Sequence, residues 1–117
     1  MAWLMLTDEY RYKIFKLVEA HPEISQRELA RELGISRGKA NYCLKALIEK
    51  GAVKAANFRN SKNKKAYLYK LTPKGIEDKT QLTFRFLMRK REEYESLKDE
   101  IEQLQHEADL VRQQKKR

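Results

Sequence analysis

Apolar residues recur every three or four positions between Thr7 and about Ala20, which predicts an amphipathic helix. The residues of its apolar face are Tyr10, Ile14, Leu17 and Val18. Thr7 is suited to cap this helix, and the two acidic residues that follow it favour the positive end of the helix dipole. The helix is expected to end at His21-Pro22, because the residue before a proline avoids helical backbone angles.

Two further helices are predicted from Ser25 to Leu33 and from Ser36 to Lys50. Ser25 and Glu28 form a capping box, and Gly34 is typical of the residue that ends a helix. The apolar faces are Leu29, Ala30 and Leu33 in the first of these helices, and Ala40, Leu44, Leu47 and Ile48, with Cys43 beside them, in the second. The opposite face of the second helix is polar and basic. Two helices joined by a short glycine turn, the second with such a face, are typical of a helix-turn-helix.

The period of the pattern changes after Gly51. Residues 52–58 and 66–71 are predicted to be two strands, with a polar and basic hairpin tip between them. A hairpin of two strands is marginally stable alone, so it is expected to pack on the helices. A helix-turn-helix followed by such a hairpin is a winged helix, and the fold class expected is therefore mainly α, of the α+β type.

One long helix is predicted after the hairpin. Thr72 is a suitable cap, and Pro73 is favoured at the first helical position. No glycine or proline follows Gly75, so the helix is expected to reach about Gln113, a length of ~60 Å at 1.5 Å per residue. We therefore expect a DNA-binding domain at residues 1–72 and a helical segment with a basic tail at residues 73–117.

The long helix carries a heptad pattern typical of a coiled coil. The apolar positions of the seam are Leu87, Tyr94, Leu97, Ile101, Leu104, Ala108 and Val111. Lys90 interrupts the seam, which is otherwise continuous from Tyr94 onward. Two hypotheses are open: the seam pairs with a second copy of the chain, or it packs back on its own chain. The length of the helix favours the dimer.

Flanking charges favour a parallel arrangement of the two helices. In a parallel pair, Glu93 would face Lys98 of the second copy, and Glu107 would face Arg112. An antiparallel pair would instead set glutamate against glutamate. Exposed ion pairs are each worth only a few tenths of a kcal/mol, so they set orientation while the apolar seam supplies affinity. The apolar arm Trp3–Leu6 is expected either to join this interface or to pack under the first helix.

The net charge of the 117-residue chain is +9, from 26 lysines and arginines and 17 acidic residues. Residues 37–70 contain ten of the basic residues and the single acidic residue Glu49. Such concentration weakens the folded state by repulsion, so it calls for a reason. A phosphate-binding face is the functional interpretation, and a solvated surface is the alternative.

Few residues suit catalysis or metal binding. The chain has one cysteine and two histidines, which excludes an intramolecular disulfide and a cysteine-based zinc site within one chain. Cys43 is more typical of a core residue than of a redox switch. We expect no enzyme activity, no metal and no cofactor. No apolar run is long enough for a membrane span, and the first residues do not resemble a signal peptide, so a cytoplasmic location is expected.

Several fragments together resemble a known family. They are residues 24–30 (ISQRELA), 33–38 (LGISRG), 47–53 (LIEKGAV) and 71–75 (LTPKG). In order and spacing they resemble the multiple antibiotic resistance regulator (MarR) family of bacterial winged-helix repressors. Asn57-Phe58, the residues 60–64, the tyrosine-rich second strand and Arg89-Lys90-Arg91 resemble its short subgroup of exopolysaccharide-associated regulators.

The resemblance implies a homodimeric transcription factor that binds double-stranded DNA, with its second helix-turn-helix helix in the major groove and its wing along the minor groove. The positions at which the family contacts bases and phosphates are occupied here by Ser36, Arg37, Lys39, Asn41, Tyr42 and Lys45. The family usually has Asp-x-Arg in the wing, whereas this chain has Asn63 and Lys65. Lysine lacks the planar fork of arginine, so phosphate contacts are expected there instead of minor-groove readout. The wing residues expected to make them are Arg59, Lys62, Lys64 and Lys65.

The chemistry of the second helix fits base reading. Arg37 is suited to a forked contact with guanine, and Asn41 to a bidentate contact with adenine. Ser36 and the free amides of the helix start suit a phosphate. Gly38 would allow close approach of DNA or is simply a tolerated surface glycine. Tyr42 would contact a thymine methyl group or a phosphate, or would brace the helix.

Three functional hypotheses remain. The first is a dimeric, sequence-specific regulator that binds an inverted repeat, a repressor by resemblance. The second is a winged-helix adaptor for another protein, and the third is a nonspecific nucleic-acid-binding protein. The basic, polar face favours the first. A small-molecule effector is not supported, because the family often encloses its ligand between helices from both termini and this chain has only one C-terminal helix.

Overall fold

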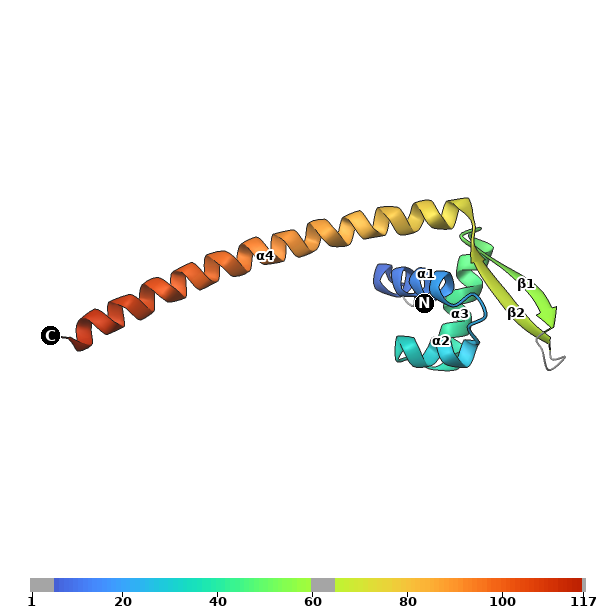
Figure 1. The fold of residues 1–117 in the computed structure, drawn as a ribbon, viewed down its shortest axis with the longest axis horizontal. Coiled ribbons are helices and arrows are strands. Elements are labelled where there is room, and N and C mark those ends of the chain that lie inside the picture. Colours follow the sequence, from blue (N-terminus) through green and yellow to red (C-terminus); the bar gives the residue numbers. More distant parts are fainter. Residues whose placement is uncertain (1–5, 60–64, 117) are drawn as a thin grey trace. The chain divides into compact units, whose positions relative to one another are not determined.

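The computed structural model describes residues 6–59 and 65–116 (Figure 1). The elements in chain order are α1 (Asp8–Ala20), α2 (Gln26–Leu33), α3 (Arg37–Glu49), β1 (Val53–Arg59), β2 (Lys65–Leu71) and α4 (Pro73–Lys115). This order confirms the mainly helical winged helix-turn-helix fold with a long C-terminal helix. The chain divides into two compact units, Met1–Thr83 and Phe84–Arg117, and the boundary between them lies within α4.

Hydroxyl caps begin each of the three short helices. The side-chain oxygens of Thr7, Ser25 and Ser36 accept from the backbone amides three residues further on, at 3.2, 3.1 and 3.1 Å. The Glu28 carboxylate accepts from the Ser25 hydroxyl at 3.0 Å, whereas a capping box would have it accept from the Ser25 backbone amide. Gly34 ends α2 in the left-handed conformation with φ 68°. These local contacts confirm the predicted helix starts.

The core of the first unit is built from all three short helices, the hairpin and the start of α4. The buried apolar residues include Ile14, Phe15, Val18, Leu29, Ala30, Leu33, Ala40, Cys43, Leu44, Leu47, Val53, Tyr69, Leu71 and Leu82. Phe15 lies outside the predicted apolar face and is nevertheless fully buried. Since α1 contacts α2, α3 and β2, it buries a wider arc than a helix packed on one side. Cys43 is a core residue, and burial raises the pKa of its thiol.

The hairpin is a two-stranded antiparallel sheet with a continuous register from Val53↔Leu71 to Arg59↔Lys65. Both strands extend one residue further toward the tip than the alternation predicts, and β1 begins one residue later. Ladder hydrogen bonds join backbone groups, so pairing continues past the last apolar side chains. The backbone amide of Tyr69 donates to the Pro22 carbonyl at 2.8 Å, which fastens β2 to the loop between α1 and α2.

The first turn of α4 lies directly against the residues that follow α3. The Thr72 amide donates to the Ala52 carbonyl at 3.0 Å, and its hydroxyl donates to the Gly51 carbonyl. The Gly75 amide donates to the Thr72 hydroxyl at 3.1 Å. A Cβ atom on Gly75 would lie 2.0 Å from the Ala52 carbonyl oxygen. Glycine is therefore required here by space.

Ion pairs join the first turns of α4 to α1 within the first unit. Asp78 contacts Lys74 at 2.9 Å and Arg11 at 3.9 Å, and Lys79 pairs with Glu19. Leu82, further along α4, is buried. Partly exposed pairs of this kind each contribute little, so the buried leucine is expected to stabilise this part of α4 more than they do.

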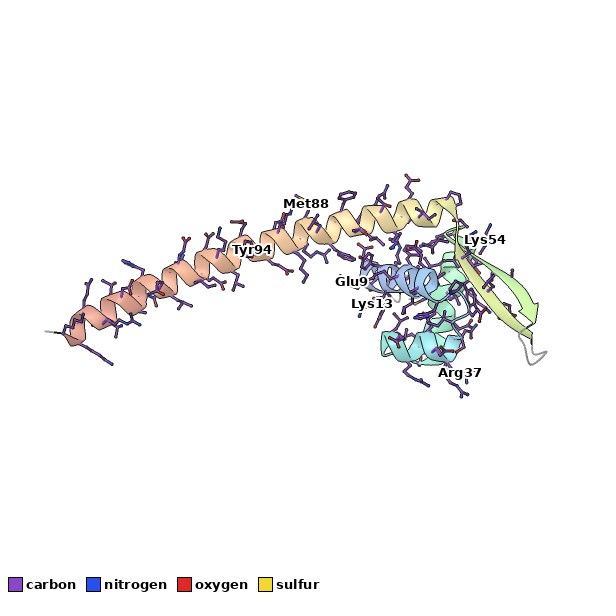
Figure 2. All side chains as sticks on the ribbon, in the orientation of Figure 1. Glu9, Lys13, Arg37, Lys54, Met88 and Tyr94 are labelled. Atoms are coloured by element: carbon purple, nitrogen blue, oxygen red, sulfur yellow. The ribbon has the colours of Figure 1, made fainter. Side chains whose placement is uncertain are left out.

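The second unit consists of the rest of α4, which ends at Lys115, two residues beyond the expected Gln113. Side chains project from all sides of this stretch, Met88 and Tyr94 among them (Figure 2). Large apolar side chains on it are between 42% and 63% exposed: Phe84, Leu87, Met88, Tyr94, Leu97, Ile101, Leu104, Leu110 and Val111. All the seam residues expected from the heptad pattern are thus exposed in the single chain, Ala108 included. Trp3 to Met5 of the apolar arm lie outside the described residues.

Candidate nucleic-acid interface

The start of α3 presents polar and basic groups at the surface. Ser36 caps the helix, and Arg37 and Gly38 follow as exposed residues in its first turn. The side chain of Arg37 extends outward (Figure 2). An exposed arginine at the start of a recognition helix is placed to reach the edges of bases.

The middle of the same helix places its polar residues at the boundary of the core. Lys39, Asn41 and Tyr42 are half-buried, whereas Lys45 is exposed. The positive charge of Lys39 acts against burial at Cys43 and lowers the pKa of that thiol relative to burial alone. Half-burial restricts side-chain motion, so these groups are held more firmly than surface lysines on a flexible stem.

Gly38 has no neighbour within 4 Å of the position where a Cβ would stand. Its φ is not positive, so backbone strain does not require glycine either. Within the described part of the chain, neither space nor backbone conformation explains glycine at this position. The close approach of DNA remains a prediction.

Asn41 is hydrogen-bonded to a residue of α2 that the sequence pattern did not single out. The Gln26 side-chain amide, at the first residue of α2, donates to the Asn41 side-chain oxygen at 3.0 Å. Gln26 also hydrogen-bonds the hydroxyl of Tyr69 on β2. Burial raises the pKa of Tyr69, and the bond to Gln26 partly offsets this effect. A series of side-chain hydrogen bonds, Asn41–Gln26–Tyr69, therefore connects α3, α2 and β2.

Two hollows lie next to these hydrogen-bonded side chains. The larger, about 530 Å³, is lined by Glu23, Ile24, Ser25, Gln26, Arg27, Arg37, Tyr67 and Tyr69. The smaller, about 160 Å³, is lined by Gln26, Asn41, Leu44, Lys45, Ile48, Ala55, Tyr67 and Tyr69. Arg27 was missed as an interface candidate, although an arginine at a helix start beside a basic helix is itself a signal. The larger hollow is thus lined by two arginines, two tyrosines and one glutamate, a net positive charge that suits a polyanion.

The wing is described by its backbone. Arg59 and Lys65 pair with each other as the last residue of β1 and the first residue of β2. Lys62 and Lys64 lie outside the described residues. The structure therefore brings two of the four predicted wing residues to the end of the ladder, and their phosphate contacts remain a prediction.

No cluster of three or more histidine, cysteine or acidic residues that could hold a metal ion occurs among residues 6–59 and 65–116. None of the helices in those ranges combines the length and apolar character that a bilayer span needs.

Comparison with known proteins supports a DNA-binding domain. Residues 7–54 match the family model described as "Winged helix-turn-helix DNA-binding". No curated protein matches the sequence. This family match covers α1, α2 and α3, which are the elements that carry the candidate interface.

Solved structures with a similar fold include several regulators. The MarR of Staphylococcus aureus, solved with salicylate and kanamycin, is 25% identical over 69% of this chain and 53% of that one, with a TM-score of 0.53. The PcaV transcriptional regulator of Streptomyces coelicolor, solved with its natural ligand, is 20% identical over 71% and 57%, with a TM-score of 0.58. A further MarR family transcription regulator is 15% identical over 95% and 78%, with a TM-score of 0.54.

The chain spans a little over half the length of the first two of these regulators. The likeness extends beyond the three short helices, because the third comparison covers nearly the whole chain. The chain thus carries a winged helix-turn-helix DNA-binding domain, in a fold similar to that of solved MarR regulators.

Proposed function

We propose that the protein is a transcription regulator of the MarR type that binds specific double-stranded DNA as a homodimer. The observation that carries the proposal is the exposed polar and basic start of α3, beside a hollow lined by Arg27 and Arg37, in a domain that matches DNA-binding proteins. Base edges are read by side chains that donate and accept, and α3 offers both.

The proposed contacts divide into two kinds. Arg37 and Asn41 read base edges in the major groove. Lysines neutralise phosphates without reading sequence: Lys39 and Lys45 on α3, and Lys62, Lys64 and Lys65 with Arg59 in the wing. Ser36 and the first amides of α3 hold a phosphate, Gly38 admits the backbone or base closely, and Tyr42 contacts a thymine methyl group or a phosphate. This division predicts different consequences for substitutions at the two kinds of position.

The regulatory role is proposed from the neighbours and the sequence resemblance together. Solved proteins of this fold include regulators from two bacteria. Resemblance to the exopolysaccharide-associated subgroup supports a bacterial repressor of exopolysaccharide genes, which would act in the cytoplasm where the chromosome lies. We include no small-molecule effector, although the S. aureus MarR was solved with salicylate and kanamycin.

A second copy of this chain is the proposed partner of the exposed seam on α4. Six large apolar residues with heptad spacing are about half exposed in the single chain: Leu87, Tyr94, Leu97, Ile101, Leu104 and Val111. Glutamates at one flank and basic residues at the other complement each other only when two such helices run parallel. Charge complementarity therefore favours a parallel homodimer.

Two of the flanking residues already have contacts within the chain. Lys90 pairs with Glu93 at 3.1 Å, and the Lys98 ammonium lies 5.6 Å from the centre of the Tyr94 ring. A pair between Glu93 and Lys98 of the second copy would compete with these contacts. The proposed pair between Glu107 and Arg112 is therefore the better probe of orientation.

Selection from a pool of random DNA duplexes at near-physiological salt, followed by sequencing, tests the proposal. An inverted repeat with half-sites about one helical turn apart is expected, because each copy presents one recognition helix. Retention of DNA without enrichment would favour the nonspecific binder. Absence of any retention would favour the adaptor for another protein.

Arg37→Ala and Lys65→Ala separate base reading from phosphate contact. On the selected site, Arg37→Ala is expected to cost about 1–3 kcal/mol and to relax the preference at one base pair. Lys65→Ala is expected to weaken binding to all sequences equally and to reduce the slope of affinity against salt. Titrations on matched and single-substituted duplexes at several salt concentrations measure both. Equal loss on all duplexes for Arg37→Ala would remove it from the base-reading set.

A further inference from the structure

Asn41 is the only one of the proposed base-reading and phosphate-binding side chains for which the described structure records a side-chain hydrogen bond to another helix. Its side-chain oxygen accepts from the Gln26 amide at 3.0 Å, across fifteen positions of sequence. Both residues are half-buried, so the bond is partly shielded from competing water. A contact of this kind restricts how Asn41 presents its two polar atoms.

The orientation of an asparagine amide decides what it reads. Adenine offers an acceptor and a donor in the major groove, and asparagine matches both only when its oxygen and nitrogen point to the correct partners. Rotation of the amide by half a turn exchanges the two atoms and destroys the match. An unrestrained amide samples both orientations. The hydrogen bond from Gln26 holds the Asn41 oxygen toward Gln26 and thereby also sets the direction of the Asn41 nitrogen. The carbonyl oxygen has a second lone pair, so it still accepts from a base.

Gln26 is itself held from the other side. Its side chain is hydrogen-bonded to the hydroxyl of Tyr69, which is 4% exposed on β2. The backbone of Tyr69 is in turn bonded to Pro22 at 2.8 Å, and its ring stacks with Tyr67 at 6.0 Å between centroids. The hydroxyl of a buried tyrosine fixed in this way is a firm support for a glutamine at the start of a helix.

We propose that Gln26 is a positioning residue, which fixes the amide of Asn41 for reading one base pair and is held in place by Tyr69. Gln26 does not touch the base in this arrangement. It acts through Asn41 and links the wing strand to the recognition helix. The inference rests on the proposed function, because it concerns how sequence is discriminated.

The test compares Gln26→Ala, Asn41→Ala and the double variant in the full-length chain. Binding of each is titrated on the selected duplex and on duplexes changed at one base pair at a time. The base pair read by Asn41 is the one whose discrimination Asn41→Ala removes. Gln81→Ala is the matched control, since Gln81 is an exposed glutamine on α4.

Gln26→Ala is expected to lower discrimination at the Asn41 base pair about two- to tenfold, the factor that corresponds to the net contribution of one hydrogen bond. Discrimination at the other base pairs should be unchanged. The double variant should discriminate no worse than Asn41→Ala alone, because both changes act on one contact. Gln81→Ala should change none of these ratios.

Gln26→Glu gives a second test that preserves the length of the side chain. A carboxylate only accepts, so it cannot donate to the Asn41 oxygen, and the asparagine amide is expected to turn. Overall affinity falls through charge repulsion, but the ratio between duplexes reports the loss at the same base pair. Tyr69→Phe should reduce this ratio less than Gln26→Ala does, since it only loosens Gln26.

Three results would overturn the inference. An unchanged ratio in Gln26→Ala would show that Asn41 is oriented without it. An equal loss on every duplex would show that Gln26 contributes only to general affinity or stability. Asn41→Ala without effect at any base pair would remove the reader itself. A wild-type chain without any sequence preference would instead overturn the proposed function, which is a distinguishable outcome.

Discussion

The first unit, here called the winged body, and the later part of α4 carry the same kind of apolar helical pattern. The apolar side chains are buried in the winged body and exposed on the later part of α4. Phe15 in α1 is fully buried, whereas Leu97 in α4 is 54% exposed. The helices of the body cover one another within the first unit. The second unit, Phe84–Arg117, is a single stretch of helix with no second element of its own. Apolar spacing thus indicates a surface that is to be buried, and it does not indicate what buries it.

The largest effect should come from the body. Phe15→Ala is expected to lower the free energy of unfolding by about 3–5 kcal/mol, because it empties a fully buried site on a helix packed on several sides. Urea unfolding followed by circular dichroism measures this loss. Leu110→Ala on exposed α4 is the control and should change stability by less than about 0.5 kcal/mol. A loss below 1 kcal/mol for Phe15→Ala would contradict the burial of that ring.

The second-largest change in free energy should come from the apolar seam of α4, where a substitution should weaken dimerisation. Leu97→Asp places two carboxylates in the apolar interface of the dimer and should raise its dissociation constant about a hundredfold or more. Sedimentation equilibrium measures this constant. Leu110 is also exposed, at 45%, but lies at an outer heptad position, so Leu110→Asp is the matched control and should leave the constant nearly unchanged. Equal effects of the two changes would show that the seam is not the interface.

The smallest change in free energy should come from the charges that flank the seam. Whether that change weakens or strengthens dimerisation reports the orientation of the two helices. Glu107→Lys in a parallel dimer sets lysine against Arg112 and should weaken dimerisation by a few tenths of a kcal/mol. In an antiparallel dimer the same change would relieve repulsion between glutamates and strengthen it. Sedimentation at low and high salt should show the effect shrink as salt screens it. Tighter association in Glu107→Lys would reverse the proposed orientation.

Helix starts and element order were predictable because their causes are local. The hydroxyls of Thr7, Ser25 and Ser36 contact amides only three residues away, so the necessary residues stand together in the sequence. The change of period after Gly51 located the hairpin to within one residue at each strand end. Patterns of this range depend little on what the rest of the chain does.

Contacts that depend on tertiary packing were missed. The burial of Phe15 depends on α1 being covered by several elements, which its own spacing does not encode. The contact between Gln26 and Asn41 joins residues fifteen positions apart, and no local pattern in the sequence relates them. Base-reading candidates on α3 could therefore be named from residue type, whereas the group that orients one of them could not.

The close approach at Gly75 has a consequence for how this chain can change over generations. Gly34 and Gly51 have positive φ angles of 68° and 77° and open space around them, so asparagine is a tolerable replacement there. At position 75 any side chain at all meets the carbonyl of Ala52. A variant population would therefore keep synonymous changes at this codon and lose those that replace the glycine. Among the four glycines, the one where the long helix leaves the hairpin is thus the most constrained by space.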